Sequence, residues 1–198
     1  VINRLTFDCP EDRLKQILSE IWYDKNSDSD QKGIGTIDFN KITPMPESLN
    51  IKCGSNTDDG INIYLTSINT SVDYFGTEKL DRKQLNGIVE KLHKLNRYSS
   101  YETHLSPDKI KVMTKYRSAD ELIQLGKTAV DNLLNYGALT WYDWSNRTDT
   151  WNTKWNSYDS EYDGGNEIEF HTAWDAPHPI IEKLSNRGFF NNSSGIHN

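Results

Sequence analysis

An aromatic segment, residues 138–175, constrains this chain more than any other stretch. It contains five of the six tryptophans, and no lysine or arginine occurs between Lys154 and Lys183. Rings at this density require a buried face, because each one removes a large apolar area from water. The spacing of the rings predicts a short helix over 139–148, with a β-hairpin after it.

The predicted hairpin has strands at 154–160 and 166–173, and its turn contains Asp163, Gly164 and Gly165. In the second strand, alternate positions are expected to face a core: Ile168, Phe170, Thr172 and Trp174. The positions between them are expected to face outward: Glu167, Glu169 and His171. Because residues 155–182 include seven acids and no lysine or arginine, this outward face is predicted to be acidic.

Composition limits the classes of function. Hydrophobic residues make up only 35% of the chain, but an aromatic share of 11% favours a folded protein. The net charge of -7 argues against nonspecific binding to nucleic acid and favours a basic protein partner. Cys9 and Cys53 form no CxxC pair, so buried, reduced thiols are expected, without a metal site or a cofactor. With no basic-then-apolar leader and no membrane-spanning run, a cytoplasmic location is expected.

The N-terminal part predicts a strand, a helix and a second strand. Residues 2–7 alternate as a half-buried strand does, with Leu5 and Phe7 inward. A helix with Pro10 at its first position is expected to follow, with a capping box formed by Asp8 and Glu11. Its apolar stripe comprises Leu14, Ile17, Leu18, Ile21 and Trp22. A polar loop over 24–35 then leads to the strand predicted at 36–40, in which Ile37 and Phe39 face inward.

Residues 45–150 are predicted to be mostly helical. Residues 61–68 favour a helix, although a strand also fits them, and 106–117 are ambiguous. Capping boxes at Asp81 with Gln84, and at Ser118 with Glu121, mark two clearer helices, and Gly137 suits the end of the second. A last short helix with Ile180, Ile181 and Leu184 is expected to stop at Gly188, before a disordered tail over 191–198.

In order, these elements form strand, helix, strand, helical insertion, strand, strand and helix. The order predicts an α+β two-layer sandwich, with the first and last helices covering one face of a single sheet. We expect one domain over 1–190, with the helical insertion at about 45–150.

Several phrases of the sequence also resemble a known family. They are NRLTF at 3–7, GTIDFNKITPMP at 35–46, GALTWYDW at 137–144, WNTKWNSYD at 151–159 and IEFHTAWDAPHP at 168–179. Together they are similar to the YubB-type ferredoxin-like domain proteins of phages and conjugative elements, over roughly residues 2–184.

This resemblance implies a ferredoxin-like βαββαβ core, the split βαβ fold, with a helical insertion after the second strand. The chain departs from that pattern at its end, where only RGFFN at 187–191 is left to supply a final strand. Some similar proteins inhibit RNA-guided CRISPR nucleases, so the resemblance implies an anti-CRISPR protein whose partner is a CRISPR effector, its guide RNA or both.

The acidic hairpin has three interpretations. Glu167, Glu169 and His171 have the chemistry of a divalent-metal or acid/base site of a ribonuclease. The acidic segment, in particular Asp159, Glu161 and Asp163, also suits contact with the phosphate-binding groove of a basic protein. A solvated sheet face with no further role is the third interpretation.

Two other features have competing interpretations. The tryptophans are either a core or a stacking platform for single-stranded nucleic acid, and their spacing favours the core. Residues 76–117 hold ten lysines and arginines against five acids. The side chains of Lys83, Lys91, Lys94 and Arg97 are either contacts to RNA or the solvated side of an amphipathic helix.

We therefore expect a cytoplasmic accessory protein of a mobile element that binds an RNA-guided nuclease or its guide RNA. The alternatives are a ribonuclease that shortens guide RNA, and an accessory protein with no role in defence.

Overall fold

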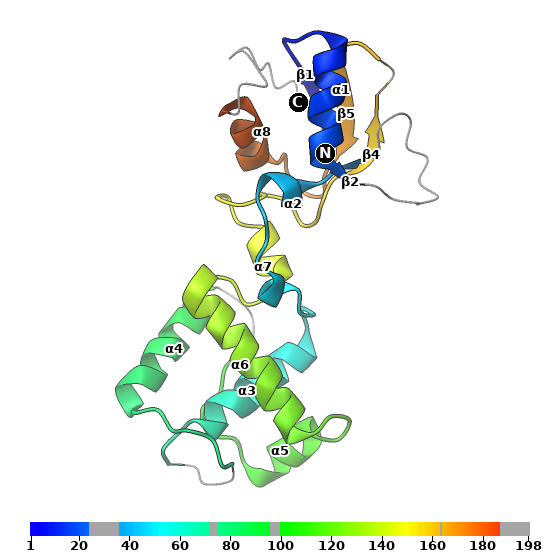
Figure 1. Cartoon of the computed structure of the whole chain (residues 1–198). Coiled ribbons are helices and arrows are strands. Elements are labelled where there is room, and N and C mark those ends of the chain that lie inside the picture. The colour runs from blue at the N-terminus through cyan, green and yellow to red at the C-terminus, as the bar shows by residue number, and fades with distance from the viewer. Residues whose placement is uncertain (24–35, 72–74, 96–99, 163, 187–198) are drawn as a thin grey trace. The chain divides into compact units, whose positions relative to one another are not determined.

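A computed structural model describes residues 1–23, 36–71, 75–95, 100–162 and 164–186 (Figure 1). The chain forms two compact units. One, here the sheet unit, combines residues 1–45 with the chain from Trp144 onward. The other, the helical unit, is the single stretch 46–143.

The sheet unit contains a three-stranded antiparallel sheet. Its strands are β1 (Ile2–Thr6), β4 (Tyr158–Glu161) and β5 (Glu167–His171), in the order β1-β5-β4 (Figure 1). Because β5 is antiparallel to both neighbours, β1 and β4 run parallel to each other. The register of β1 on β5 pairs Leu5 with Ile168 and Arg4 with Glu169.

The core of this unit lies between the sheet and two helices, α1 (Glu11–Ile21) and α8 (His178–Leu184). The predicted alternation is confirmed within β5, where Ile168 and Phe170 are buried. The predicted stripe of α1 is also confirmed, except that Trp22 belongs to the next strand. The core comprises Leu5, Phe7, Leu14, Ile17, Leu18, Ile21, Ile37, Phe39, Ile42, Trp151, Tyr162, Ile168, Phe170, Ile180 and Leu184.

The strand predicted at 36–40 is wrong in its length and its sheet. A separate two-stranded sheet pairs β2 (Trp22–Tyr23) with β3 (Thr36–Ile37), and α2 (Phe39–Ile42) begins immediately afterwards. Asp38 ends the strand because its carboxylate accepts a hydrogen bond from the Asn40 backbone N–H and so caps α2. Ile37 and Phe39 are nevertheless buried, as predicted. The polar loop predicted at 24–35 lies outside the described residues.

The start of α1 also differs from the prediction. Pro10 is the N-cap rather than the first helical residue, and no side chain caps the helix. Glu11 does not complete a capping box, because its carboxylate forms an ion pair with Lys15 at 2.6 Å, one turn further on.

The helical unit contains α3 (Ser55–Ser67), α4 (Arg82–Lys94), α5 (Pro107–Met113), α6 (Ala119–Tyr136) and a 3-10 helix at Glu47–Leu49. Both predicted capping boxes are present, and Gly137 ends α6 in the left-handed conformation with φ 69°. The structure also resolves the ambiguous segments as helices, α3 and α5. The helix predicted at 139–148 is shorter, α7 (Trp141–Ser145). It starts after Thr140, where Asp143 accepts hydrogen bonds from the backbone N–H groups of Leu139 and Thr140.

Two glycines allow α3 and α6 to approach closely. A Cβ atom added at Gly126 would lie 2.0 Å from the carbonyl oxygen of Gly60, and one at Gly60 would lie 2.9 Å from that of Leu122. Only hydrogen fits at Gly126 without separating the helices.

Two further predictions are tested by the described residues. No helix among them has the length and apolarity to span a membrane. Cys9 is partly buried and Cys53 is exposed, so the expected burial of both thiols is wrong for Cys53. The Gly188 stop and the tail at 191–198 lie outside the described residues.

Candidate interaction surface

One face of the three-stranded sheet lies opposite the core, and we call it the outer face. Register places its side chains in three rows across the strands. The first row is Ile2, His171 and Tyr158, the second is Arg4, Glu169 and Glu161, and the third is Thr6 and Glu167. The outward direction predicted for Glu167, Glu169 and His171 agrees with their exposed or partly exposed positions.

A β-bulge in β4 places Tyr158 and Glu161 on this same face. These residues are three positions apart, yet they pair with His171 and Glu169, which are two apart. The extra residue is accommodated at Asp159, whose φ of 46° lies in the left-handed region that aspartate tolerates. Ser160 consequently points inward and is 4% exposed, while Glu161 points outward.

Polar contacts link the rows of the outer face. The Arg4 Nε donates a hydrogen bond to Glu169 Oε2 at 2.6 Å, and this bond raises the pKa of Arg4. The Thr6 hydroxyl donates to Glu167 Oε2 at 3.4 Å. The Arg4 side chain is 69% exposed and that of Glu169 is 26% exposed, so the ion pair lies at the surface and contributes little to stability.

His171 is the middle residue of the first row, next to Glu169 of the second row. Its Nδ1 is 3.6 Å from Asp159 Oδ2, and its Nε2 is 4.0 Å from Glu169 Oε1. Its ring meets the ring of Tyr158 edge-on, with a centroid separation of 5.7 Å. The imidazole therefore has carboxylates on two sides and an aromatic ring on a third.

The three residues predicted to be catalytic are only partly brought together. Glu169 and His171 are neighbours, whereas Glu167 lies one row away and contacts Thr6. Within the described residues, no group of three or more aspartate, glutamate, histidine or cysteine side chains is arranged to hold a metal ion. Arg4 and His171 instead both lie beside Glu169.

The residues predicted for partner contact occupy two different units. Asp159 and Glu161 are exposed in the sheet unit, and Asp163 lies outside the described residues. Lys83, Lys91 and Lys94 are exposed on α4 of the helical unit. Arg97 lies outside the described residues.

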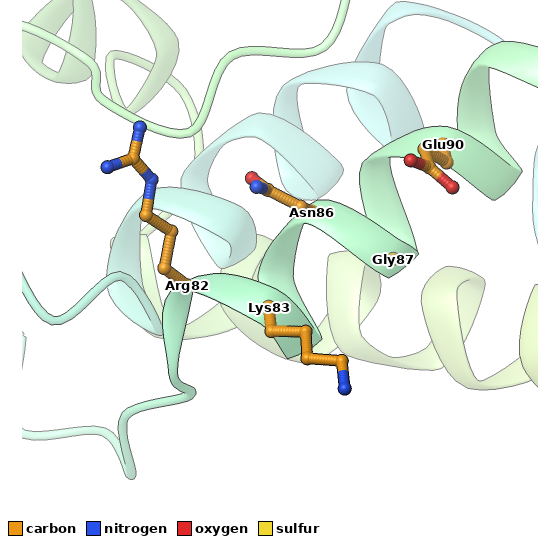
Figure 2. A pocket seen from close by; sticks show the side chains of 5 residues that line it. All are labelled: Arg82, Lys83, Asn86, Gly87 and Glu90. Atoms are coloured by element: carbon orange, nitrogen blue, oxygen red, sulfur yellow. The ribbon is translucent and has the colours of Figure 1, made fainter.

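The exposed side of α4 forms a shallow hollow of about 610 Å³, lined by Arg82, Lys83, Asn86, Gly87 and Glu90. Figure 2 shows Arg82 and Lys83 pointing in different directions from the helix, with Glu90 further along it. Cations that diverge in this way do not combine around one phosphate, and Glu90 opposes an anion. Because Leu85, Ile88 and Leu92 form its buried stripe, α4 has the pattern of an ordinary amphipathic helix.

An exposed pair of tryptophans was missed by the sequence analysis. Trp155 is 45% exposed and Trp174 is 63% exposed, and the Lys154 Nζ lies 4.5 Å and 4.9 Å from their ring centroids. The inward direction predicted for Trp174 is wrong, because β5 ends at His171 and Trp174 adopts a φ of 78°. The available sequence signal was Lys154 beside Trp155, directly before the acidic residues 155–182.

The other tryptophans of the aromatic segment are closer to the prediction. Trp151 is 5% exposed, packs edge-on against Phe39 and donates from its indole to the Thr43 carbonyl at 2.9 Å. Trp141 and Trp144 are partly buried. The segment therefore provides both core and surface.

Comparison with known proteins supports the ferredoxin-like part of the resemblance. A family model described as the ferredoxin-like domain in Api92-like protein matches residues 150–187, which include β4, β5 and α8. Searches of curated proteins and of solved structures found no match. Over its C-terminal hairpin and last helix, the chain is therefore similar to the ferredoxin-like domain of Api92-like proteins.

Proposed function

We propose that this chain is a binding protein that docks a basic protein partner on the outer face of its sheet unit. The charge of that face is the observation that carries the proposal. Among the described residues, Asp159, Glu161, Glu167 and Glu169 contribute carboxylates to the face or its edge, and Arg4 is the one cation in its three rows. The pairing of Arg4 with Glu169 leaves a net negative surface for complementary charge.

The fold that supports this surface is, in this proposal, a complete ferredoxin-like sandwich. A strand lying between two parallel strands is the arrangement of a split βαβ unit, which β1, β5 and β4 match. The last strand that such a fold requires falls in the sequence on residues 187–191, which lie outside the described residues. The helical unit would then be the insertion, after β3.

The partner that we propose is an RNA-guided nuclease of a CRISPR system, which the chain would inhibit in the cytoplasm of a host bacterium. Two lines of support lead to this class. The sequence phrases resemble those of mobile-element proteins, some of which are inhibitors of this kind. A nuclease that holds RNA and DNA presents basic grooves, and an acidic face competes for such grooves.

The test is a binding measurement on purified protein. Immobilised CRISPR effector, with and without guide RNA, is titrated with the wild-type chain and with the double variant Glu161→Lys, Glu167→Lys. We expect the wild type to bind, the affinity to fall with increasing salt, and the variant to lose at least tenfold in affinity.

A matched control separates this face from general charge effects. Glu90→Lys changes an exposed carboxylate on α4 of the helical unit. Once the change in net charge is allowed for, the affinity of this variant for the effector should stay within about twofold of wild type. Equal losses for the two kinds of variant, or no binding to any effector at any salt concentration, would contradict the proposal.

A ribonuclease is the second candidate, because Arg4 and His171 both lie beside Glu169. A cation able to hold phosphate next to an acid/base pair is a minimal arrangement for RNA cleavage. Guide RNA is incubated with the protein in Mg²⁺ or in EDTA, with His171→Ala as the comparison. Cleavage that the His171→Ala variant lacks would favour the enzyme, whereas intact guide in both tubes would reject it for that substrate.

A further inference from the structure

The exposed rings of Trp155 and Trp174 form a surface feature that the charge of the outer face does not explain. We propose that they form a clamp for an arginine side chain of the partner, and that Lys154 occupies the clamp when no partner is bound. This inference rests on the proposed function, since it assigns a specific recognition element to the same basic partner. The tryptophan clamp here means Trp155, Trp174 and the position between them that Lys154 fills.

The backbone that carries the clamp is fixed by several hydrogen bonds. The Lys154 backbone N–H donates to the Ala173 carbonyl at 3.3 Å, which ties the two ring-bearing segments together beyond the ends of β4 and β5. The Thr153 hydroxyl donates to the same carbonyl at 2.8 Å, and the Asn152 amide donates to the Ala176 carbonyl at 3.0 Å. Rings on a braced backbone lose little freedom on binding, which suits an interface anchor.

The conformation of Trp174 is costly and keeps its ring at the surface. Its φ of 78° lies in the left-handed region, which bulky side chains rarely adopt, and 63% of the residue stays exposed. Strained positions of this kind concentrate at ligand sites, where the surrounding structure holds them in place.

The position between the rings already accepts a cation. The ammonium of Lys154 lies within 5 Å of both centroids, which is the distance of a cation–π contact. A guanidinium is planar and less strongly hydrated than an ammonium, and it stacks on aromatic faces. An arginine should therefore displace Lys154, which is free to move into water on its flexible stem.

Charge favours arginine over a nucleobase as the occupant. Asp175 follows Trp174 directly and is exposed, and the outer face of the same hairpin is acidic. A nucleotide would bring its phosphates against these carboxylates, whereas an arginine-bearing peptide is attracted by them. Lys154 makes the choice between arginine and nucleotide testable. Its ammonium competes with an arginine for the position between the rings, but it would attract the phosphate of a nucleotide.

Two labelled peptides of equal charge serve as probes, one of alternating glycine and arginine and the other of alternating glycine and lysine. Fluorescence anisotropy measures their binding to the full chain. We expect the wild type to prefer the arginine peptide by about two- to fivefold, as an exposed cation–π contact allows. Trp174→Leu and Trp155→Leu should remove this preference, and Lys154→Met should strengthen binding of the arginine peptide by a few fold.

A second exposed ring with a lysine beside it provides the matched control. Lys115 lies 5.0 Å from the ring centroid of Tyr116, which is 86% exposed in the helical unit. Tyr116→Leu should leave the arginine preference unchanged. Circular dichroism checks that each variant is folded before its binding is compared.

The contrary outcomes count against the clamp alone or against both the clamp and the acidic docking face. Binding of both peptides with no arginine preference, or a preference that survives Trp174→Leu, overturns the clamp and leaves the acidic face as the docking surface. Absence of binding to either peptide overturns both. Binding of a uridine oligonucleotide that Trp174→Leu abolishes and Lys154→Met weakens assigns the rings to nucleobases and overturns the arginine clamp.

Discussion

The two units of this protein are stabilised in different ways. The helical unit is one continuous stretch, 46–143, with a mainly aliphatic core that includes Ile61, Leu65 and Leu85. The sheet unit joins segments from both ends of the sequence, and its core contains the rings of Phe7, Phe39 and Phe170. In the helical unit, close contact between α3 and α6 depends on two glycines. In the sheet unit, large aromatic side chains fill the space between the sheet and the helices.

This difference determines how each unit tolerates substitution. Where backbones touch, as at Gly60 and Gly126, adding one carbon does harm. Where rings fill a layer, removing a ring does harm. Tryptophan fluorescence and circular dichroism can follow the units separately, because five of the six tryptophans belong to the sheet unit and the long helices belong to the helical unit.

Phe170→Ala is expected to have the largest effect. Phe170 is 1% exposed at the centre of the sheet, and its ring centroid lies 6.3 Å from that of Phe39. Loss of the ring should lower the free energy of unfolding of the sheet unit by about 3–5 kcal/mol. The midpoint of denaturant unfolding, monitored by tryptophan fluorescence, should shift to a lower denaturant concentration. Tyr158→Ala, a ring 37% exposed on the outer face, is the control and should shift it far less.

Gly126→Ala tests the helical unit by adding an atom to its core instead of removing a ring. Its Cβ atom would lie 2.0 Å from the Gly60 carbonyl oxygen, so α3 and α6 must separate. We expect the free energy of unfolding to fall by about 3 kcal/mol. Denaturant unfolding monitored by circular dichroism at 222 nm measures this change. Gly87→Ala, on the exposed side of α4 with nothing within 4 Å, should instead stabilise by about 0.5–1 kcal/mol. Equal effects of the two alanines would contradict the close approach of the helices.

Ser118→Ala measures a local contribution to the same unit. The Ser118 hydroxyl accepts a hydrogen bond from the Glu121 backbone N–H, and the Glu121 carboxylate accepts one from the Ser118 N–H. Removing the hydroxyl should cost about 1 kcal/mol in thermal or denaturant unfolding. Ser106→Ala, at the start of the shorter α5, which has no buried residues, should cost less. A larger loss from Ser106→Ala would show that α5 contributes more than its burial suggests.

Glu121→Gln should give the smallest effect, visible as a change in pH dependence. Hydrogen bonds from Ser118 hold the pKa of Glu121 below the ordinary value of 4.5. A lowered pKa in the folded state means that the charged form stabilises the helix above about pH 4.5, and that this stability is lost as the pH falls through the folded-state pKa. The wild type should exceed the variant in melting temperature at neutral pH and converge with it in acid. A constant difference across that range would show that charge is not involved.

The outer face and the exposed side of α4 differ in how their charged side chains are positioned. On the outer face, strand pairing brings Arg4, Glu169 and Glu161 into one row from distant parts of the chain. On α4, helical spacing alone sets the positions of Lys83, Lys91 and Lys94, and Arg82 and Lys83 diverge. The sequence indicated both charge patterns, but only the pairing of strands produces converging groups.

The sequence by itself determined a large part of the local structure. Its capping boxes, its helical spacing and the alternation of β5 predicted α4, α6 and the buried side of the hairpin, because each depends on residues within a few positions of one another. The tertiary structure decided the rest. The bulge at Asp159, the exposure of Trp174 and the contact of Gly60 with Gly126 depend instead on how separate segments of the chain pack together, which no local spacing specifies.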